Sequence, residues 1–211
     1  MNRLLYSSTN LEGLVLMVKM TGGHALVQAL INENIRVIFG LPGVQILDIY
    51  DALYLHPEIR VITVRHEQAT SQMAYGYARA TGEPGVAIVV PGPGFLNAAT
   101  GMGTAYSTST PILLVSGQIP SSSLGKKLGE LHEIEDQMAV LKTMTKWQAM
   151  ALKVSDIPSM VREAFRQMKT GRPRPVEIEV PLDVLTSSDE ADFSRPEPEE
   201  PLAADQESIS M

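Results

Sequence analysis

The chain has 211 residues, of which 44% are hydrophobic and 19% charged, a globular composition that excludes bulk disorder. It contains no cysteine, which excludes disulfides, thiolate nucleophiles, iron–sulfur clusters and zinc ribbons. Its four histidines share no HxH or HxxxH spacing, so we expect no metal ligands in this chain.

The acidic charge is confined to the C-terminal end. Residues 187–211 hold eight acidic residues and one arginine, which together account for the whole net charge of −7. The neutral remainder has no basic stripe, which argues against a nucleic-acid partner. The apolar stretch 14–18 is too short to span a membrane and lacks a cleavage site beside it. We therefore expect a cytoplasmic protein that binds neither nucleic acid nor membrane.

Three stretches differ in character along the chain. Residues 1–20 show no clean periodicity and are predicted to be an N-terminal extension, with translation starting at Met17 or Met20. Residues 187–211 mix prolines with acids and serines, which predicts an acidic, proline-rich linker. The domain itself is expected to span 21–186.

Within that domain, short apolar runs alternate with helical patterns. Strands are predicted at 36–39, 60–64, 85–90, 112–116, 146–150 and 176–180, and helices at 23–33, 44–55, 67–80, 95–106 and 156–169. Several of the runs lack polar alternation, as expected for strands buried on both faces. The regular alternation predicts an α/β fold of three layers, α/β/α, with a mostly parallel six-stranded sheet.

In such sheets ligands bind beyond the carboxyl ends of the strands. The segments that follow four of the predicted strands are Gly40-Leu41-Pro42-Gly43, Arg65-His66-Glu67, Pro91-Gly92-Pro93-Gly94 and Gly117-Gln118. Two of them are glycine–proline turns, which let the backbone approach a ligand closely. A dinucleotide site is disfavoured, because Asn97 replaces the third glycine of GxGxxG and no acidic residue follows before Gly129.

Glu67 allows two interpretations. A glutamate in the first turn of a helix can simply complement the helix dipole, which is worth under about 1 kcal/mol. However, the helix that it begins is rich in alanine and glycine, which predicts close packing on both sides. A glutamate at the buried end of such a helix requires a specific partner.

Six blocks of sequence, in this order, resemble the amino-terminal, pyrimidine-binding domain of thiamine-diphosphate enzymes, above all the acetolactate synthase large subunit. They are VIFGLPG (37–43), RHEQA (65–69), YGYARATG (75–82), GPGFLNA (92–98), PILLVSGQ (111–118) and TGRPRPV (170–176). Each block alone is weak, but the ordered set is specific and covers nearly all of residues 21–186.

The resemblance implies roles for residues in three of these blocks. Family members use the glutamate at the position of Glu67 to hydrogen-bond N1′ of the cofactor's aminopyrimidine, which promotes loss of a proton from the thiazolium and attack on a 2-keto acid. The segments around it would line the pyrimidine and the substrate, so the implied cofactor-binding residues are Pro42, Gly43, Glu67, Gly92, Pro93, Gly94 and Asn97.

The sequence departs from the family pattern at three places. Acetolactate synthases have Ser-Gly-Pro-Gly where this chain has Pro91-Gly92-Pro93-Gly94, Pro-Gly-Gly where it has Pro42-Gly43-Val44, and Phe-Gln-Glu where it has Leu131-His132-Glu133. The last block lies near the substrate in the family, which makes His132 a candidate contact to the substrate or the cofactor. A histidine on a surface loop is an equal alternative.

Other parts of the family are not found in this sequence. It has no Gly-Asp-Gly segment to hold Mg²⁺ and the diphosphate, and no middle domain, which binds FAD in some members. The resemblance implies that a diphosphate-binding domain lies elsewhere in the same protein or on a second chain, and that the enzyme is a homodimer or tetramer. Two alternatives stay open: the α-type subunit of a two-chain decarboxylase of the sulfopyruvate or phosphonopyruvate type, and a non-catalytic α/β binding module.

Overall fold

The computed structural model of the protein describes residues 17–194, and a six-stranded sheet forms its centre. All six strands run parallel, in the order β3-β2-β4-β5-β7-β6. They are β2 (Val37–Gly40), β3 (Arg60–Thr63), β4 (Gly85–Val89), β5 (Ile112–Gln118), β6 (Trp147–Met150) and β7 (Val176–Pro181). The six predicted strands are confirmed, with ends that shift by one or two residues.

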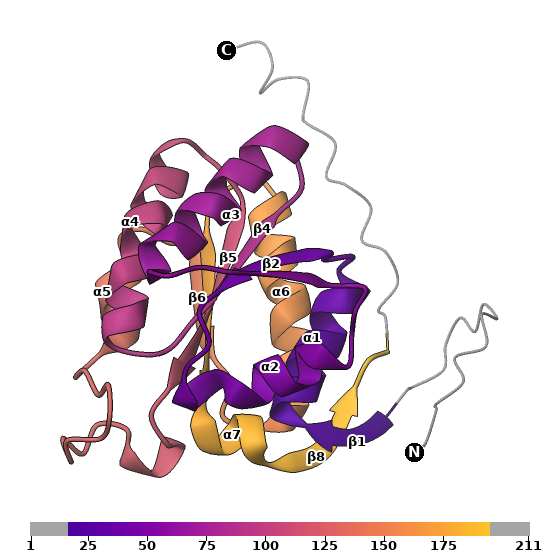
Figure 1. Cartoon of the computed structure of the whole chain (residues 1–211), viewed down its shortest axis with the longest axis vertical. Coiled ribbons are helices and arrows are strands. Elements are labelled where there is room, and N and C mark those ends of the chain that lie inside the picture. The colour runs from indigo at the N-terminus through magenta and orange to yellow at the C-terminus, as the bar shows by residue number, and fades with distance from the viewer. Residues whose placement is uncertain (1–16, 195–211) are drawn as a thin grey trace.

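Helices cover both faces of this sheet, which confirms the three-layer α/β/α fold (Figure 1). One face carries α1 (Gly22–Asn32), α2 (Leu47–Tyr54), α6 (Ile157–Lys169) and α7 (Leu182–Thr186); the other carries α3 (Glu67–Thr81), α4 (Pro93–Ser107) and α5 (Gln137–Leu141). Short 3₁₀ turns are η1 (Val44–Ile46), η2 (Ser121–Ser123) and η3 (Val154–Asp156). The helix predicted over 44–55 is therefore split into η1 and α2. Helices α5 and α7 were not predicted, because five residues are too few to show a helical period.

The core consists of two layers, because the central strands are apolar on both sides. In β4, Val86 and Ile88 pack against the face with α1, α2 and α6, while Ala87 and Val89 pack against the face with α3 and α4. Fully burying a valine or isoleucine side chain is worth roughly 1.5–3 kcal/mol, so these strands fix the sheet at the centre of the molecule.

A second, two-stranded sheet joins the two ends of the described chain. Strand β1 (Met17–Thr21) pairs antiparallel with β8 (Ser188–Asp192), and Ala191 and Phe193 are buried in the core beside α6. The expected extension and linker thus each contribute a strand that the predicted limits, 21–186, leave out. Only Ala191 of β8 is buried, so the segment shows no alternation to detect. The rest of the predicted extension and linker, 1–16 and 195–211, lies outside the described residues.

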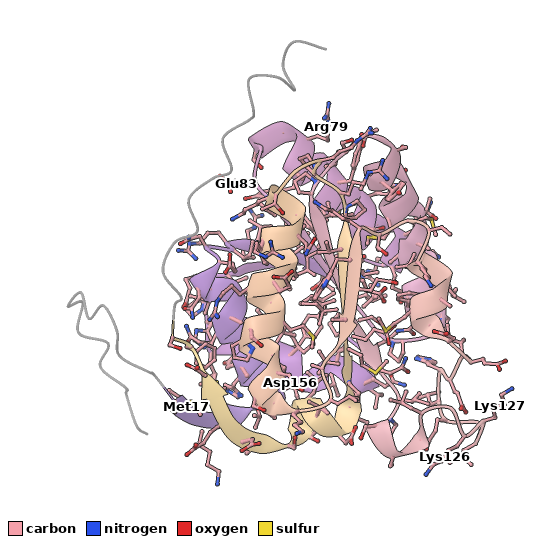
Figure 2. The ribbon with its side chains drawn as sticks, turned by 180° about the vertical axis from the view of Figure 1, so that it is seen from behind. Met17, Arg79, Glu83, Lys126, Lys127 and Asp156 are labelled. Carbon is pink, nitrogen blue, oxygen red and sulfur yellow. The ribbon has the colours of Figure 1, made fainter. Side chains whose placement is uncertain are left out.

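The two ends of the sheet carry different loops. Figure 2 shows Arg79 and Glu83 at the end where β4 begins, and Lys126 and Lys127 at the opposite end, on the loop that follows β5. The carboxyl ends of the parallel strands therefore lie toward the end marked by the two lysines, which is where an α/β sheet binds its ligands. Between residues 17 and 194 no helix is long and apolar enough to cross a membrane.

Candidate active site

Glu67 is the first residue of α3, directly after the turn that leaves β3. His66 caps the helix, because its Nδ1 accepts a hydrogen bond from the backbone N–H of Gln68 at 3.3 Å. This cap gives His66 a structural role and places the half-buried side chain of Glu67 at the carboxyl end of the sheet.

Asn97, one turn into α4, holds one oxygen of this carboxylate. Its Nδ2 donates to Glu67 Oε2 at 2.9 Å. The two helices approach closely at Gly101, where a Cβ would lie 2.3 Å from Ser71 Oγ of α3. Among the described residues nothing donates to Glu67 Oε1, so one carboxylate oxygen is fixed and the other is available to an external donor.

Val90 is packed between the two glycine turns. A Cβ on Gly43 would lie 2.4 Å from Val90 Cγ1, and a Cβ on Gly94 would lie 2.6 Å from Val90 Cγ2. The same Cβ on Gly94 would lie 3.4 Å from Cγ of Glu67. A side chain at Gly43 or Gly94 would therefore collide with Val90. The two turns lie close together on either side of Val90, and with Glu67 and Asn97 the two glycines form what we call the Glu67 cluster.

The remaining turn residues shape the backbone. Pro42 and Pro93 are exposed, and Pro93 begins α4, where a proline fits the first helical turn. Gly92 has φ +59°, and a Cβ there would lie 2.3 Å from the carbonyl oxygen of His132. The turn over residues 92–94, called the Gly92 turn below, therefore depends on glycine for both its conformation and its space.

The predicted substrate residue His132 lies against this turn. It is half-buried, its backbone has φ +67°, and its Nδ1 is buried without a partner among the described residues. Gln45 of η1 ties the same loop down, because its Nε2 donates to the carbonyl of Leu131 at 3.0 Å. The Oε1 atom of Gln45 is also buried and has no hydrogen-bond partner among the described residues. Two unpartnered polar atoms thus lie beside the glycine turns.

Sequence reasoning missed Gln45 and Gln137. Gln137 is buried, and its Oε1 accepts a hydrogen bond from the backbone N–H of Gly92 at 2.8 Å. It begins the five-residue helix α5, so no periodicity marked it, and its partner is 45 residues away in the sequence.

The profile of the thiamine pyrophosphate enzyme N-terminal TPP-binding domain matches residues 20–140 of this chain, a range that contains the whole Glu67 cluster. The chain belongs to this family. The resemblance inferred from six blocks of sequence is thereby confirmed.

Three curated relatives illustrate which proteins the chain is similar to. The chain is 43% identical to the probable 2-ketoarginine decarboxylase AruI of Pseudomonas aeruginosa, over 83% of its own length and 31% of the relative. It is 38% identical to acetolactate synthase isozyme 3 large subunit of Escherichia coli over 86% and 31% of the two lengths. For the probable acetolactate synthase large subunit of Methanocaldococcus jannaschii the identity is 41%, over 78% and 27%. The chain thus spans about a third of the length of these relatives.

The residues present fit the ring of thiamine pyrophosphate better than its diphosphate. An aminopyrimidine needs a hydrogen-bonding carboxylate and close backbone approach, which Glu67 Oε1 and the side-chain-free Gly43 and Gly94 offer. Between residues 17 and 194 no group of three or more potential metal ligands gathers. Lys126 and Lys127 point away from the body of the domain (Figure 2), and Lys127 pairs with exposed Glu135 at 2.8 Å. The Glu67 cluster therefore fits the ring, whereas the described residues hold no group of metal ligands for the diphosphate.

Proposed function

We propose that residues 21–186, together with β1 and β8, form the pyrimidine-binding part of an acetolactate-synthase-like, thiamine-diphosphate-dependent 2-keto acid decarboxylase or carboligase. The observation that carries the proposal is the Glu67 cluster, in which a carboxylate with one open oxygen lies beside two glycine turns in a chain of this family. The names of the relatives, a 2-ketoarginine decarboxylase and acetolactate synthases, support the same class of chemistry.

Each residue of the site has a distinct part in this proposal. Glu67 Oε1 binds N1′ of the aminopyrimidine and holds the proton shared with it, while Asn97 fixes Oε2 and so orients the carboxylate. Pro42, Gly43, Gly92, Pro93 and Gly94 shape the backbone that lies against the ring. His132 faces the substrate side of the Gly92 turn. When bound, the cofactor supplies the nucleophilic carbon and the electron sink that decarboxylation of a 2-keto acid requires.

Completion of the active site requires further protein. Residues 1–186 carry no net charge and the described residues hold no group of potential metal ligands, so we propose that another domain or a second chain holds Mg²⁺ and the diphosphate. The assembled enzyme would be a cytoplasmic homodimer or tetramer, with FAD as a further cofactor and a place in branched-chain amino acid biosynthesis.

The test is Glu67→Gln in the complete enzyme that contains this chain. The amide keeps the size of the side chain and its hydrogen bond to Asn97, but it cannot hold the shared proton. We expect turnover to fall by about 10²- to 10⁴-fold, the range of a positioned acid–base group. Substrate turnover and thermal unfolding should be measured on the same preparation.

Glu83→Gln is the matched control, because Glu83 is exposed at the opposite end of the domain (Figure 2). It should leave turnover unchanged. If Glu67→Gln retains most of the activity while remaining folded, Glu67 has no part in the reaction.

A further inference from the structure

Strand β7 carries two glutamates into the core of the domain. Glu177 and Glu179 are both 0% exposed. As alternate residues of one strand they point to the same side of the sheet, which is the side covered by α5. Burying a carboxyl group without partners is costly, so the hydrogen bonds of both side chains must be accounted for.

Both oxygens of Glu179 accept hydrogen bonds from glutamines. Gln118 Nε2 of β5 donates to Oε2 at 2.9 Å, and Gln137 Nε2 of α5 donates to Oε1 at 3.1 Å. The arrangement suits an ionised carboxylate, which only accepts. Glu179 also lines a cavity of about 190 Å³ beside Gln118, Asp136 and Gln137, so its charge lies nearer to water than that of Glu177 does.

Only one of the two carboxyl oxygens of Glu177 accepts a hydrogen bond. Gln148 Nε2 of β6 donates to its Oε2, whereas its Oε1 is buried and no described group donates to it. In the part of the chain that the structure describes, neither carboxyl forms an ion pair, and the further charge that acts on Glu179 is Asp136, another carboxylate. The surrounding side chains from β5, β6 and α5 are amides and the hydroxyl of Ser116.

A proton on Glu177 supplies the missing partner, because a neutral carboxyl group can donate to the neighbouring carboxylate. Burial, and next the charge of Glu179, raise the pKa of Glu177 to about 10. Burial also raises the pKa of Glu179, while the amide donors lower it. The geometry and the charges agree that Glu177 is the acid of the pair and Glu179 the carboxylate.

Glu179 is one of three acceptors that set which way the amide of Gln137 faces. The NH₂ group of Gln137 donates to Glu179 Oε1 at 3.1 Å, to Ser116 Oγ at 3.0 Å and to the carbonyl of Gly117 at 3.3 Å. Its oxygen is therefore the atom that turns toward Gly92, whose N–H it accepts at 2.8 Å. The Gly92 turn continues to Gly94, which lies against Glu67.

We propose that Glu177 and Glu179 share one proton in the folded chain and that this pair, acting through Gln137, positions the Gly92 turn. The inference rests on the proposed function only in treating that turn as part of the cofactor site. Glu177, Glu179 and Gln137 are positioning residues, since none of them belongs to the Glu67 cluster itself.

Two substitutions of equal size separate this role from simple packing. In Glu177→Gln the new NH₂ group replaces the proton as donor to Glu179, so the network stays complete. In Glu179→Gln the new NH₂ group must face the NH₂ of Gln118 or that of Gln137. When it faces Gln137, that amide loses its carboxylate acceptor and turns, which removes the acceptor for the N–H of Gly92. Because both side chains are fully buried, a purely steric role would make the two variants equally damaging.

The shared proton also has a signature in the pH dependence of folding. Below the ordinary glutamate pKa of 4.5, Glu177 is protonated in both the folded and the unfolded chain. Between that value and about 10, the unfolded chain releases the proton and the folded chain keeps it. The contribution of Glu177 therefore falls with rising pH, by about tenfold per pH unit in the folding equilibrium constant. Glu177→Gln removes this dependence.

The experiment uses the 211-residue chain without cofactor, so its outcome is independent of the proposed function. Infrared spectra at neutral pH should show a neutral carboxylic acid band that is lost in Glu177→Gln and kept in the exposed control Glu135→Gln. Hydrogen exchange at the amide of Gly92 should be slow in wild type and in Glu177→Gln, and at least about tenfold faster in Glu179→Gln.

Urea unfolding between pH 5 and 8 completes the test. The folding equilibrium constant of Glu177→Gln relative to wild type should rise by about tenfold per pH unit. The proposal is overturned if the acid band survives in Glu177→Gln, if the relative stability does not change with pH, or if Glu177→Gln and Glu179→Gln speed exchange at Gly92 equally.

Discussion

Glu67 and Glu179 are both connected to the Gly92 turn and differ in how many of their carboxylate oxygens have a hydrogen-bond donor. Glu67 is half-buried, contacts the turn at Gly94 and accepts one hydrogen bond, from Asn97, so that Oε1 stays available. Glu179 is fully buried and reaches Gly92 through Gln137, and amide donors occupy both of its oxygens. The first arrangement can bind a ligand, and the second can only hold the protein together.

The difference shows that the number of hydrogen bonds, more than the residue type, separates a binding carboxylate from a structural one. A carboxylate whose hydrogen-bond partners all belong to the protein stabilises the fold, and its substitution lowers the free energy of unfolding. Substitution of a carboxylate with an open oxygen should change the stability of the ligand-free protein little and lower the turnover of the enzyme strongly.

The largest effect on folding is expected for Glu179→Met compared with Glu67→Met. Methionine has a similar length and no acceptor, so at position 179 it leaves the buried donor of Gln118 and the proton of Glu177 without a partner. We expect a loss of about 2–4 kcal/mol in the free energy of unfolding. At position 67 the amide of Asn97 can turn to water, and the loss should stay below about 1 kcal/mol. Urea unfolding of the two variants at one pH measures both values.

Equal losses of unfolding free energy in the two methionine variants would show that Glu67 and Glu179 do not differ in their structural roles. A destabilisation of Glu67→Met as large as that of Glu179→Met would mean that Glu67 is a structural carboxylate. A neutral Glu179→Met would mean that the glutamines around β7 do not depend on it.

A smaller effect is expected where Gly94 contacts Glu67. In Gly94→Ala the new Cβ would lie 2.6 Å from Val90 Cγ2, so the turn must shift, and we expect a loss of about 1–3 kcal/mol in the free energy of unfolding. The control is Gly76→Ala on the exposed side of α3, where a Cβ meets nothing within 4 Å. Alanine is the better helix former, so the control should gain about 0.5–1 kcal/mol. Chemical denaturation of both variants tests the contact, and a Gly94→Ala protein as stable as wild type would show that the turn has room for a side chain.

The fold was predictable because its strands are short, apolar and separated by helical periods. The six strands of the parallel sheet follow from runs such as 85–90, which have no polar alternation. Strands β1 and β8 were not predictable, because each has only five residues and their pairing depends on a contact between positions about 170 apart. A local pattern carries no information about such a pairing until the core that supports Ala191 exists.

The site was predictable where it follows strand ends and not where it lies inside a strand. Glu67 and the glycine turns stand at positions where an α/β sheet presents ligands, and the structure brings Gly43, Glu67, Gly94 and Asn97 together. The segment VEIEV (176–180) was predicted as a strand from its apolar residues, although the alternation of its two glutamates indicates one polar face. Their partners Gln118, Gln137 and Gln148 come from three other elements, which only the fold assembles.

We expect Glu67 Oε1 to receive the aminopyrimidine ring of thiamine diphosphate. The direct measurement is a nuclear magnetic resonance titration of the 211-residue chain with thiamine diphosphate and Mg²⁺, following the side-chain amide of Asn97 and the backbone amides of Gly43 and Gly94. Without a site for the diphosphate, ring contacts leave an affinity no better than about millimolar. We predict saturable shifts of these three signals in that range, unchanged in Glu83→Gln and abolished in Glu67→Gln. Shifts that persist in Glu67→Gln would show that Glu67 does not bind the ring. The absence of any shift of the three signals at saturating cofactor would show the same.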